Sequence, residues 1–165
     1  MNEKEQNQLF QQLMEQHKGI LFKIARTYCQ DEEDRQDIIQ EMMIQIWQSL
    51  HKYNDKFKIS TWLYRISLNV AISFYRKDRR QKNVHVLSET LIEIENEQED
   101  DLEENIQRLQ GFILELKELD RALILLYLED KSYGEISEIL GITVTNVATK
   151  LSRIKELLKL KFKSL

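Results

Sequence analysis

Proline is absent from this chain of 165 residues, and glycine occurs only four times. These two residues mark most turns, and an all-β sandwich or barrel needs a turn signal about every 8–12 residues. Helices joined by short polar loops need far fewer turn formers. The shortage of both residues therefore predicts an all-α fold, and hydrophobic residues at 42% of the chain are enough to build its core.

The net charge of −4 hides three segments of different sign. Residues 1–87 carry 14 basic and 11 acidic side chains, and residues 105–165 carry 10 basic and 8 acidic ones. Residues 88–104 carry nine acidic side chains and no basic one. Because highly charged segments with few aromatic residues rarely bury a core, we predict a flexible acidic linker between two small helical domains. The predicted boundaries are 1–80, 81–104 and 105–165.

The composition also limits location and chemistry. Cys29 is the only cysteine, so no internal disulfide can form, and we predict a cytoplasmic protein. His17, His51 and His85 lack ligand spacing, so no metal site is expected. Because the N-terminus is polar and no apolar run is long enough to span a membrane, we expect no signal peptide and no membrane insertion. No catalytic set is evident, so we expect no enzyme, no cofactor and no small-molecule substrate.

Apolar spacing predicts the helices of both domains. In the first, one apolar stripe runs from Leu9 to Tyr28, and a second helix carries its apolar residues from Ile38 to Leu50 with Asp37 on its other side. We then expect a loop over 51–60 and a third helix capped by Ser60 or Thr61. The second domain begins near Asn105 with one helix. There the nearly all-apolar segment RALILLYLED is expected to form the central helix.

Two local signals complete the second domain, and both follow from helix capping. Asp120 is a plausible N-cap for the central helix. Ser132, followed three residues later by Glu135, fits a capping box, Gly141 can end that short helix, and Thr143 can cap the last one.

The segment from Ser132 to Lys155 therefore has the pattern of a helix-turn-helix. The last helix has a polar and basic outer face that can donate hydrogen bonds to base edges in the major groove. An ordinary helical hairpin with a solvated face is the alternative. The candidate DNA-reading residues are Thr145, Asn146, Thr149, Lys150 and Arg153.

Aromatic and basic residues alternate between Lys52 and Arg80. Single-stranded DNA is held in this way, with bases stacked on rings and phosphates neutralised by cations. The rings are Tyr53, Phe57, Trp62, Tyr64, Phe74 and Tyr75, and the cations are Lys52, Lys56, Lys58, Arg65, Arg76, Lys77, Arg79 and Arg80. Alternatively, Trp62 and Phe74 belong to the core, which the apolar stripe favours for Phe74. A third segment, residues 34–47, reads by itself as an amphipathic acidic helix with a solvated face.

Three stretches resemble the sigma-70 superfamily of transcription factors: DRQDIIQEMMIQIW, FKISTWLYRISLNVAISFYRKDRR and LKELDRALILLYLEDKSYGEISEILGITVTNVATKLSRIKELL. They are similar to its smallest members, the extracytoplasmic-function (group 4) sigma factors. The resemblance covers about residues 15–80 and 105–160. It implies two domains, regions 2 and 4 of the family, in a non-enzymatic protein that recognises promoters for core RNA polymerase and promotes DNA melting.

The resemblance also implies roles and partners. The helix with Asp37, Gln40, Glu41 and Ile44 would dock on core RNA polymerase, and the last helix would read the minus-thirty-five element of promoter DNA. A partner anti-sigma factor is implied as well. The residues implied to hold the minus-ten element are Lys52, Tyr53, Asn54, Lys56, Phe57, Lys58, Trp62, Arg65, Asn69, Arg76, Lys77 and Arg80.

Two positions depart from the family pattern. Ala148 stands where a basic residue is common, which weakens the expected minus-thirty-five contact. Gly134 lies inside a helix and should cost about 1 kcal/mol against alanine. With few phosphate contacts, we expect weak binding to isolated DNA and a shallow dependence on salt.

Two other functions fit parts of the sequence. A dimeric helix-turn-helix repressor or activator would bind duplex DNA alone, although it would not need the aromatic and basic segment. An interaction module would sequester polymerase or another regulator without reading DNA. Replacing Lys150 and Arg153 with alanine separates the three functions. Promoter-specific transcription should fall if the chain is a sigma factor, and operator binding should fall if it is a repressor or activator. Neither should change if it is an interaction module.

Overall fold

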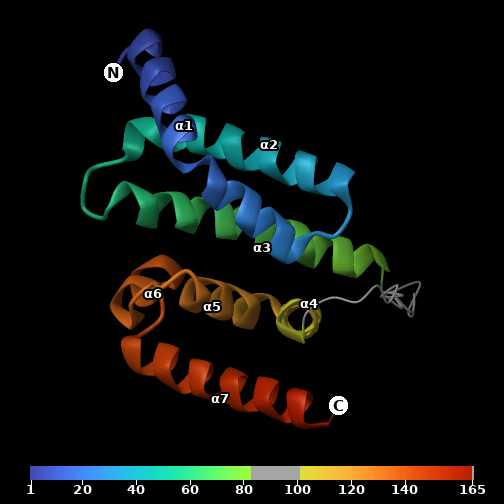
Figure 1. The fold of residues 1–165 in the computed structure, drawn as a ribbon. Helices are drawn as coiled ribbons and strands as arrows, with labels where there is room; N and C mark the ends of the chain where they lie inside the picture. Colours follow the sequence, from blue (N-terminus) through green and yellow to red (C-terminus); the bar gives the residue numbers. More distant parts are fainter. Residues whose placement is uncertain (83–100, 165) are drawn as a thin grey trace.

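The computed structural model describes residues 1–82 and 101–164 (Figure 1), and within these residues it contains helices and no strand. The N-terminal lobe, residues 1–82, contains α1 (Glu3–Tyr28), α2 (Glu32–Ser49), the short 3₁₀ helix η1 (Leu50–Lys52) and α3 (Ile59–Lys82). The C-terminal lobe, residues 101–164, contains α4 (Asp101–Leu114), α5 (Glu118–Leu128), α6 (Tyr133–Leu140) and α7 (Val144–Lys163). The predicted all-α class is confirmed.

The three long helices of the N-terminal lobe all pack on one another around a shared core. Their apolar residues recur at helical spacing, so each helix turns one stripe inward. The side chains that are completely buried include Leu21 and Ile24 of α1, Met42 and Ile46 of α2, and Leu63 of α3. The outer faces of α2 and α3 are consequently free to carry polar residues.

The C-terminal lobe is built around α5, as its apolar sequence predicts. Leu123 and Leu126 of α5 are completely buried, and α4, α6 and α7 all pack against this helix. From α6 and α7, Ile136 and Leu151 close the core. The buried stripe of α7 faces inward, so its opposite face is left to solvent.

Local capping begins α6 and α7 at the predicted residues, and of the capping box predicted at Ser132 the structure has the bond accepted by the Ser132 side chain. The Ser132 side chain accepts a hydrogen bond from the Glu135 backbone N–H at 3.1 Å, and Thr143 caps Asn146 in the same way at 3.1 Å. Between them, Gly141 has the left-handed φ of 68°. The helix-turn-helix geometry thus follows from three short-range rules that the sequence alone supplies.

We expect Gly141→Ala to destabilise the protein and Gly134→Ala to stabilise it. A side chain at a left-handed position costs roughly 1–2 kcal/mol, and no atom lies within 4 Å of an added Gly141 Cβ, so the cost is conformational. Gly134 is helical, and alanine there should gain about 0.5–1 kcal/mol. Urea denaturation of both variants measures the two shifts, and a stabilised Gly141→Ala would contradict the assignment of this turn.

Two predicted helix caps are wrong, and α1 begins earlier than its apolar stripe. α1 begins at Glu3 rather than near residue 9, since Asn2 and Glu5 form a capping box. α5 begins at Glu118 after Lys117, so Asp120 lies in its first turn and is not its N-cap. α3 begins at Ile59, so neither Ser60 nor Thr61 precedes it.

The predicted linker, 81–104, is shorter at both ends than expected. α3 continues to Lys82, and α4 already begins at Asp101, inside the acidic segment. Residues 83–100, which contain most of the predicted linker, lie outside the described residues.

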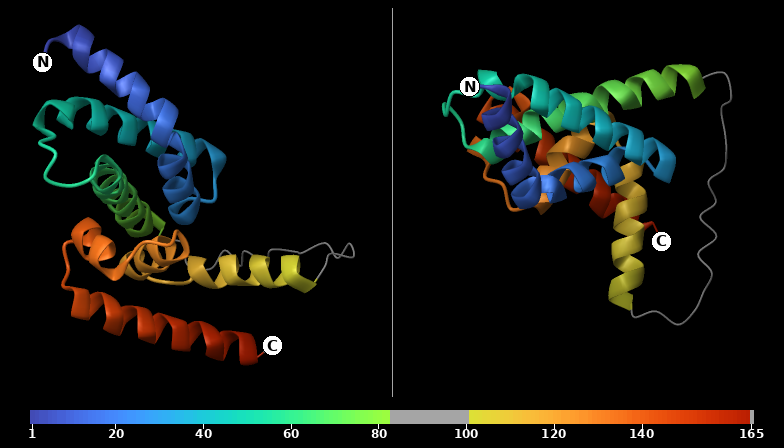
Figure 2. Two further views of the ribbon diagram at one scale, coloured as in Figure 1. Left: turned by 60° about the vertical axis from the view of Figure 1, so that its left-hand side comes forward. Right: turned by 90° about the horizontal axis from the view of Figure 1, so that it is seen from above.

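The two lobes lie against each other, a contact that the sequence did not predict. α6 and α5 pack on α3, and α5 also contacts α1 (Figures 1 and 2). Tyr64 of α3 is 4% exposed and has the Lys131 ammonium 5.2 Å from its ring centroid. Tyr28 at the end of α1 donates a hydrogen bond from its hydroxyl to the Glu118 carbonyl oxygen of α5.

Alkaline pH should therefore destabilise the folded chain. Burial raises the pKa of Tyr28, and burial followed by the nearby Glu129 charge raises the pKa of Tyr64 to about 12. Since an unfolded tyrosine ionises near pH 10, these phenols stabilise the fold below that pH, and this stability is lost as pH rises from about 10 to 12. Absorbance at 295 nm should show late-ionising phenols, one of which disappears in Tyr64→Phe. Simultaneous ionisation of all phenols near pH 10 with the helices intact would contradict this.

Candidate nucleic-acid interface

The exposed face of α7 gathers the residues predicted to read duplex DNA. Their spacing of one, three and four residues keeps them on one side of a helix, opposite the buried Val147, Leu151 and Ile154. Thr145, Asn146, Thr149 and Arg153 are exposed, and Lys150 is half-buried. A row of hydroxyl, amide and cationic groups on a rigid helix can donate to base edges and phosphates.

The loop between η1 and α3 is held by its own polar and aromatic residues. The Tyr53 hydroxyl donates to the Phe57 carbonyl oxygen at 2.8 Å, and Asn54 Oδ1 accepts from the Lys56 backbone N–H at 3.2 Å. Asp55 adopts a left-handed φ of 59°, which tightens the turn. The exposed side chains of Lys52, Asn54, Lys56 and Lys58 surround this loop.

Rings and cations alternate where this loop meets α3. Two cations lie over the Phe57 ring. The guanidinium of Arg65, in α3, lies 5.1 Å from the ring centroid, and the Lys56 ammonium lies 5.7 Å from it. The Tyr53 and Trp62 rings lie 5.4 Å apart. Trp62 is half-buried: one part of its ring packs against the core, and the other part is accessible for stacking with a base.

The surface of rings and cations formed by the loop continues along one side of α3 and not along the other. By their spacing, Trp62, Arg65, Asn69 and Arg76 lie on one face of the helix. Lys77 is exposed beside them, and the Arg80 side chain is outside the described part. Tyr64 and Tyr75 lie on the side that packs against the C-terminal lobe, so the interpretation of all six aromatic residues as one stacking surface is wrong for these two.

Arg76 already has a partner in this structure. Its Nε lies 3.0 Å from Glu118 Oε1 in the C-terminal lobe. The backbone N–H of Glu118, followed by the Arg76 side chain, lowers the pKa of this carboxyl group. This predicted DNA contact is thus engaged in a contact between the lobes.

An acidic and apolar face lies on the outside of α2. Asp37, Gln40, Glu41 and Ile44 are all exposed at the spacing of one helical face, and Ile44 is 49% exposed. Gln45 Nε2 donates to Glu41 Oε1 at 2.9 Å and orients that carboxylate. This face of α2 therefore presents one apolar side chain, Ile44, among polar and acidic ones.

A groove of about 290 Å³ joins the faces of α2 and α3. Glu41 and Gln45 line it from α2, and Asn69 and Lys77 line it from α3. One predicted polymerase-binding residue, Glu41, and two predicted strand-binding residues, Asn69 and Lys77, therefore line the same depression of the N-terminal lobe.

Neither a metal-ion site nor a membrane-spanning helix is found in the described part of the chain. Within residues 1–82 and 101–164, no three histidine, cysteine, aspartate or glutamate side chains are grouped so as to hold a metal ion. In the same ranges, no helix is both long and apolar enough to cross a membrane.

Family models match both lobes. The model described as sigma-70 region 2 matches residues 13–81, and the model described as sigma-70, region 4 matches residues 106–158. RNA polymerase sigma factor YlaC of Bacillus subtilis is 30% identical over 132 residues, which are 77% of this chain and 76% of that protein. RNA polymerase sigma-H factor of Pseudomonas aeruginosa is 30% identical, with 86% of this chain and 78% of that protein covered. Sigma factor SigV of B. subtilis is 29% identical, with 87% and 85% covered.

Two solved structures share the arrangement of both lobes. CnrH in complex with the cytosolic domain of CnrY has a TM-score of 0.70 at 21% identity, covering 96% of this chain and 90% of that one. RpoE in complex with the anti-sigma factor NepR, from Bartonella quintana, has a TM-score of 0.73 at 21% identity, covering 93% and 96%. At this identity the likeness concerns the fold. The relatives also include SigM and SigW of B. subtilis, both named as ECF RNA polymerase sigma factors. Together with the two matched regions, these findings lead to one conclusion: the chain belongs to the sigma-70 family of RNA polymerase sigma factors, in its extracytoplasmic-function branch.

Proposed function

We propose that this chain binds core RNA polymerase through α2, holds the opened minus-ten element on α3 and its preceding loop, and reads the minus-thirty-five element with α7. The observation that carries the proposal is the groove between α2 and α3, because Glu41 of the acidic face and Asn69 and Lys77 of the proposed strand-binding face line it together. A protein that melts DNA for an enzyme needs these two surfaces side by side.

The polymerase contact is proposed for Asp37, Gln40, Glu41 and Ile44. Carboxylates around an exposed apolar side chain fit a partner surface that is basic with an apolar centre. In the complex, Ile44 would be buried against that centre, and the charges would orient the two surfaces. The rigid packing of the opposite face of α2 keeps these groups in place.

The strand contact is proposed for the loop and α3. A flipped base would stack on the rings of Tyr53, Phe57 or Trp62, and each stacked base is worth roughly 1–3 kcal/mol. This offsets the few kcal/mol needed to unstack a base from a duplex. The remaining proposed contacts to bases and phosphates are Lys52, Asn54, Lys56, Lys58, Arg65, Asn69, Arg76, Lys77 and Arg80.

The duplex contact is proposed for Thr145, Asn146, Thr149, Lys150 and Arg153. Ala148 leaves a short apolar side chain in this row, so Lys150 and Arg153 supply the two cations of the face. In this role the chain catalyses nothing itself, since polymerase carries out the synthesis of RNA. Binding to the polymerase of a bacterial cell also implies that the chain works in the cytoplasm.

We further infer that an anti-sigma factor regulates this chain. The two similar solved structures are complexes of CnrH with the cytosolic domain of CnrY and of RpoE with the anti-sigma factor NepR. A partner that covers the exposed faces of α2 or α7 would compete with polymerase or with DNA.

Transcription in vitro with purified core polymerase on a genomic library tests the proposal. We expect transcript starts that require the chain, with permanganate-reactive thymines upstream of them where the duplex has opened. Phe57→Ala should lower the permanganate signal more than it lowers binding to core enzyme. Tight operator binding without polymerase would instead identify a repressor, and the absence of chain-dependent starts would reject the sigma function.

A further inference from the structure

The first turns of α1 contribute little to the core of the N-terminal lobe. Residues 1–5 are exposed, and the apolar stripe of this helix begins only at Leu9. The capping box of Asn2 and Glu5 nevertheless starts the helix before that stripe. These turns also precede residues 13–81, the segment that matches region 2. What they add to the molecule is therefore set by what they contact.

Two neighbouring amide side chains in these turns reach the end of α2. Gln6 Nε2 donates a hydrogen bond to the Trp47 carbonyl oxygen at 2.6 Å. The Trp47 indole Nε1–H in turn donates to Asn7 Oδ1 at 2.9 Å. One bond holds the main chain of Trp47 and the other holds its ring, so this residue is fixed both in position and in orientation.

Trp47 lies in the last turn of α2, where backbone groups need outside partners. The last four carbonyl groups of an α-helix have no N–H partner within the helix. α2 ends at Ser49, so the Trp47 carbonyl is one of these four. It accepts from the Leu50 N–H and from the half-buried Gln6 amide. The end of α2 is thereby held by α1 as well as by its own turn.

The end of α2 leads directly into the loop proposed to capture the strand. Leu50, the first residue of η1, is 1% exposed, and α1 contacts η1. The Tyr53 N–H donates to the Leu50 carbonyl oxygen at 3.2 Å, and the Tyr53 hydroxyl holds the Phe57 carbonyl oxygen at 2.8 Å. A continuous series of hydrogen bonds therefore runs from Gln6 through Trp47 to the two rings of the loop.

We propose that Gln6 and Asn7 are positioning residues for strand capture, which hold η1 and the following loop through Trp47 so that the rings of Tyr53 and Phe57 are in place before DNA binds. The proposal deepens the function proposed above and rests on it for the capture step. Neither amide needs to touch the strand. The benefit is preorganisation, because a loop that is already ordered loses little further freedom when a base stacks on it.

Tryptophan fluorescence of the full chain tests the positioning without polymerase. Trp47 and Trp62 are the only two tryptophans, so Trp47→Phe leaves Trp62, whose ring lies 5.4 Å from that of Tyr53, as the reporter on the loop. This substitution removes the bond to Asn7, whereas Gln6 can still bond to the backbone. Adding Gln6→Ala should loosen the loop and raise the rate constant for acrylamide quenching of Trp62 up to about twofold. Unchanged quenching would overturn the proposal.

Two isosteric substitutions at adjacent positions give the sharpest test in the complex with core polymerase, because the two bonds have opposite polarity. Gln6 donates, so Gln6→Glu sets a carboxylate against the Trp47 carbonyl oxygen and removes the bond. Asn7 accepts, so Asn7→Asp keeps an acceptor for the indole N–H. Gln6→Glu should lower the permanganate reactivity of minus-ten thymines roughly tenfold, and Asn7→Asp should stay within about twofold of wild type.

The two variants control for each other, since they add the same charge one residue apart. Equal losses would mean that negative charge rather than hydrogen bonding disturbs opening and would overturn the proposal, as would two undiminished signals. Gln8→Ala with Gln12→Ala removes two exposed amides from the opposite face of the same turns and should open the promoter as wild type does. If Gln6→Glu loses helical circular dichroism, Gln6→Ala, which removes the donor without adding a charge, decides.

Binding to core polymerase distinguishes positioning from a merely structural role. A structural role would lower the affinity for core enzyme together with promoter opening, whereas we expect the affinity of Gln6→Glu to stay within about twofold of wild type. Faster quenching of Trp62 without chain-dependent transcription by any variant would reject the proposed function and support the positioning of the loop. Normal transcription with unchanged quenching and opening in the variants would reject only the positioning role.

Discussion

Replacing Ile44 with glutamate is expected to weaken the binding of this chain to core RNA polymerase by at least about 30-fold, the effect of roughly 2 kcal/mol at the centre of an interface. Ile44 is 49% exposed on α2 and is surrounded by Asp37, Gln40 and Glu41. A fourth polar group there would remove the apolar contact and bury a charge at the interface. Because the side chain is outside the core, the stability of the lobe should hardly change.

Titration of fluorescently labelled chain with core enzyme measures this effect. Phe22→Glu is the matched control, since Phe22 is 43% exposed on α1 and undergoes the same change from an apolar to an acidic side chain. Equal losses for both variants would mean that added negative charge, rather than the α2 face, disturbs binding. Unchanged binding of Ile44→Glu would remove α2 from the proposed polymerase interface.

The second large effect is expected for Lys150→Ala combined with Arg153→Ala. Each base contact of a long cationic side chain is worth about 1–3 kcal/mol, so loss of both should lower promoter-specific transcription at least about 30-fold. The two side chains point away from the core stripe of α7, and alanine is a strong helix former, so the helix itself should persist.

Transcription from a promoter with an intact minus-thirty-five element measures this loss, and the same promoter with that element scrambled should show little difference between variant and wild type. Lys159→Ala with Lys163→Ala removes two exposed cations from the end of the same helix and is the control for general electrostatic attraction. An equal loss for the control pair, or an undiminished effect on the scrambled promoter, would contradict base reading by this face.

Much of the fold could be predicted because its rules act over a few residues. Ser132, Gly141 and Thr143 shape the helix-turn-helix through contacts within three or four positions, and the apolar stripes give each helix its buried side. Helix starts are harder to predict. α5 begins after Lys117, whose side chain makes no capping hydrogen bond, so no capping residue marks the start in the sequence. Asp120, a residue type that often caps helices, lies three positions further on and gives a wrong start.

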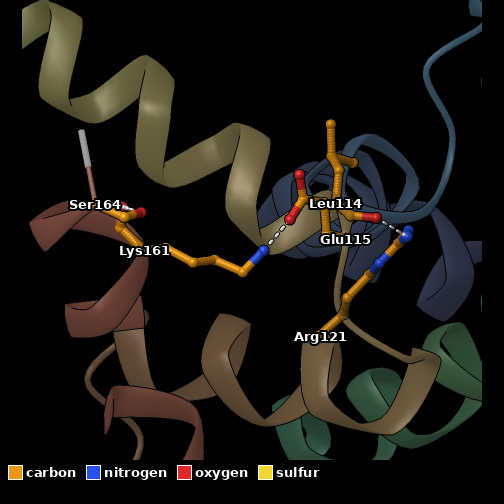
Figure 3. Close-up of polar contacts among 5 residues, drawn as sticks. All are labelled: Leu114, Glu115, Arg121, Lys161 and Ser164. Atoms are coloured by element: carbon orange, nitrogen blue, oxygen red, sulfur yellow. Dashed lines mark hydrogen bonds and ion pairs between the residues drawn. The ribbon is translucent and has the colours of Figure 1, made fainter. Parts of the chain in front are cut away.

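The contact between the lobes could not be predicted, because its partners are far apart in the chain. Arg121 lies in an apolar segment, where its guanidinium reaches the turn between α4 and α5 (Figure 3), and it finds Thr27 across 94 residues and Tyr75 across 46. No short-range pattern distinguishes this arginine from one that reaches solvent at the end of a helix. For the same reason, the sequence did not separate Tyr64 and Tyr75, which face the other lobe, from Trp62, which does not.

The proposed site residues of α2, α3 and α7 are exposed or half-buried wherever the structure describes their side chains, which leaves them accessible to macromolecules. The variants of Ile44, Phe57, Lys150 and Arg153 are chosen because each removes one class of contact and spares the core.

α3 makes contacts on two of its sides. On one flank, Trp62 and Arg65 would contact a captured strand, and on the other Tyr64 and Tyr75 contact the C-terminal lobe. Because α3 is one continuous helix, a rotation about its axis would move the side chains of both flanks together. Substitutions in its buried core, such as at Leu63, should consequently alter strand capture and lobe docking together, and genetic screens for either trait would recover the same positions.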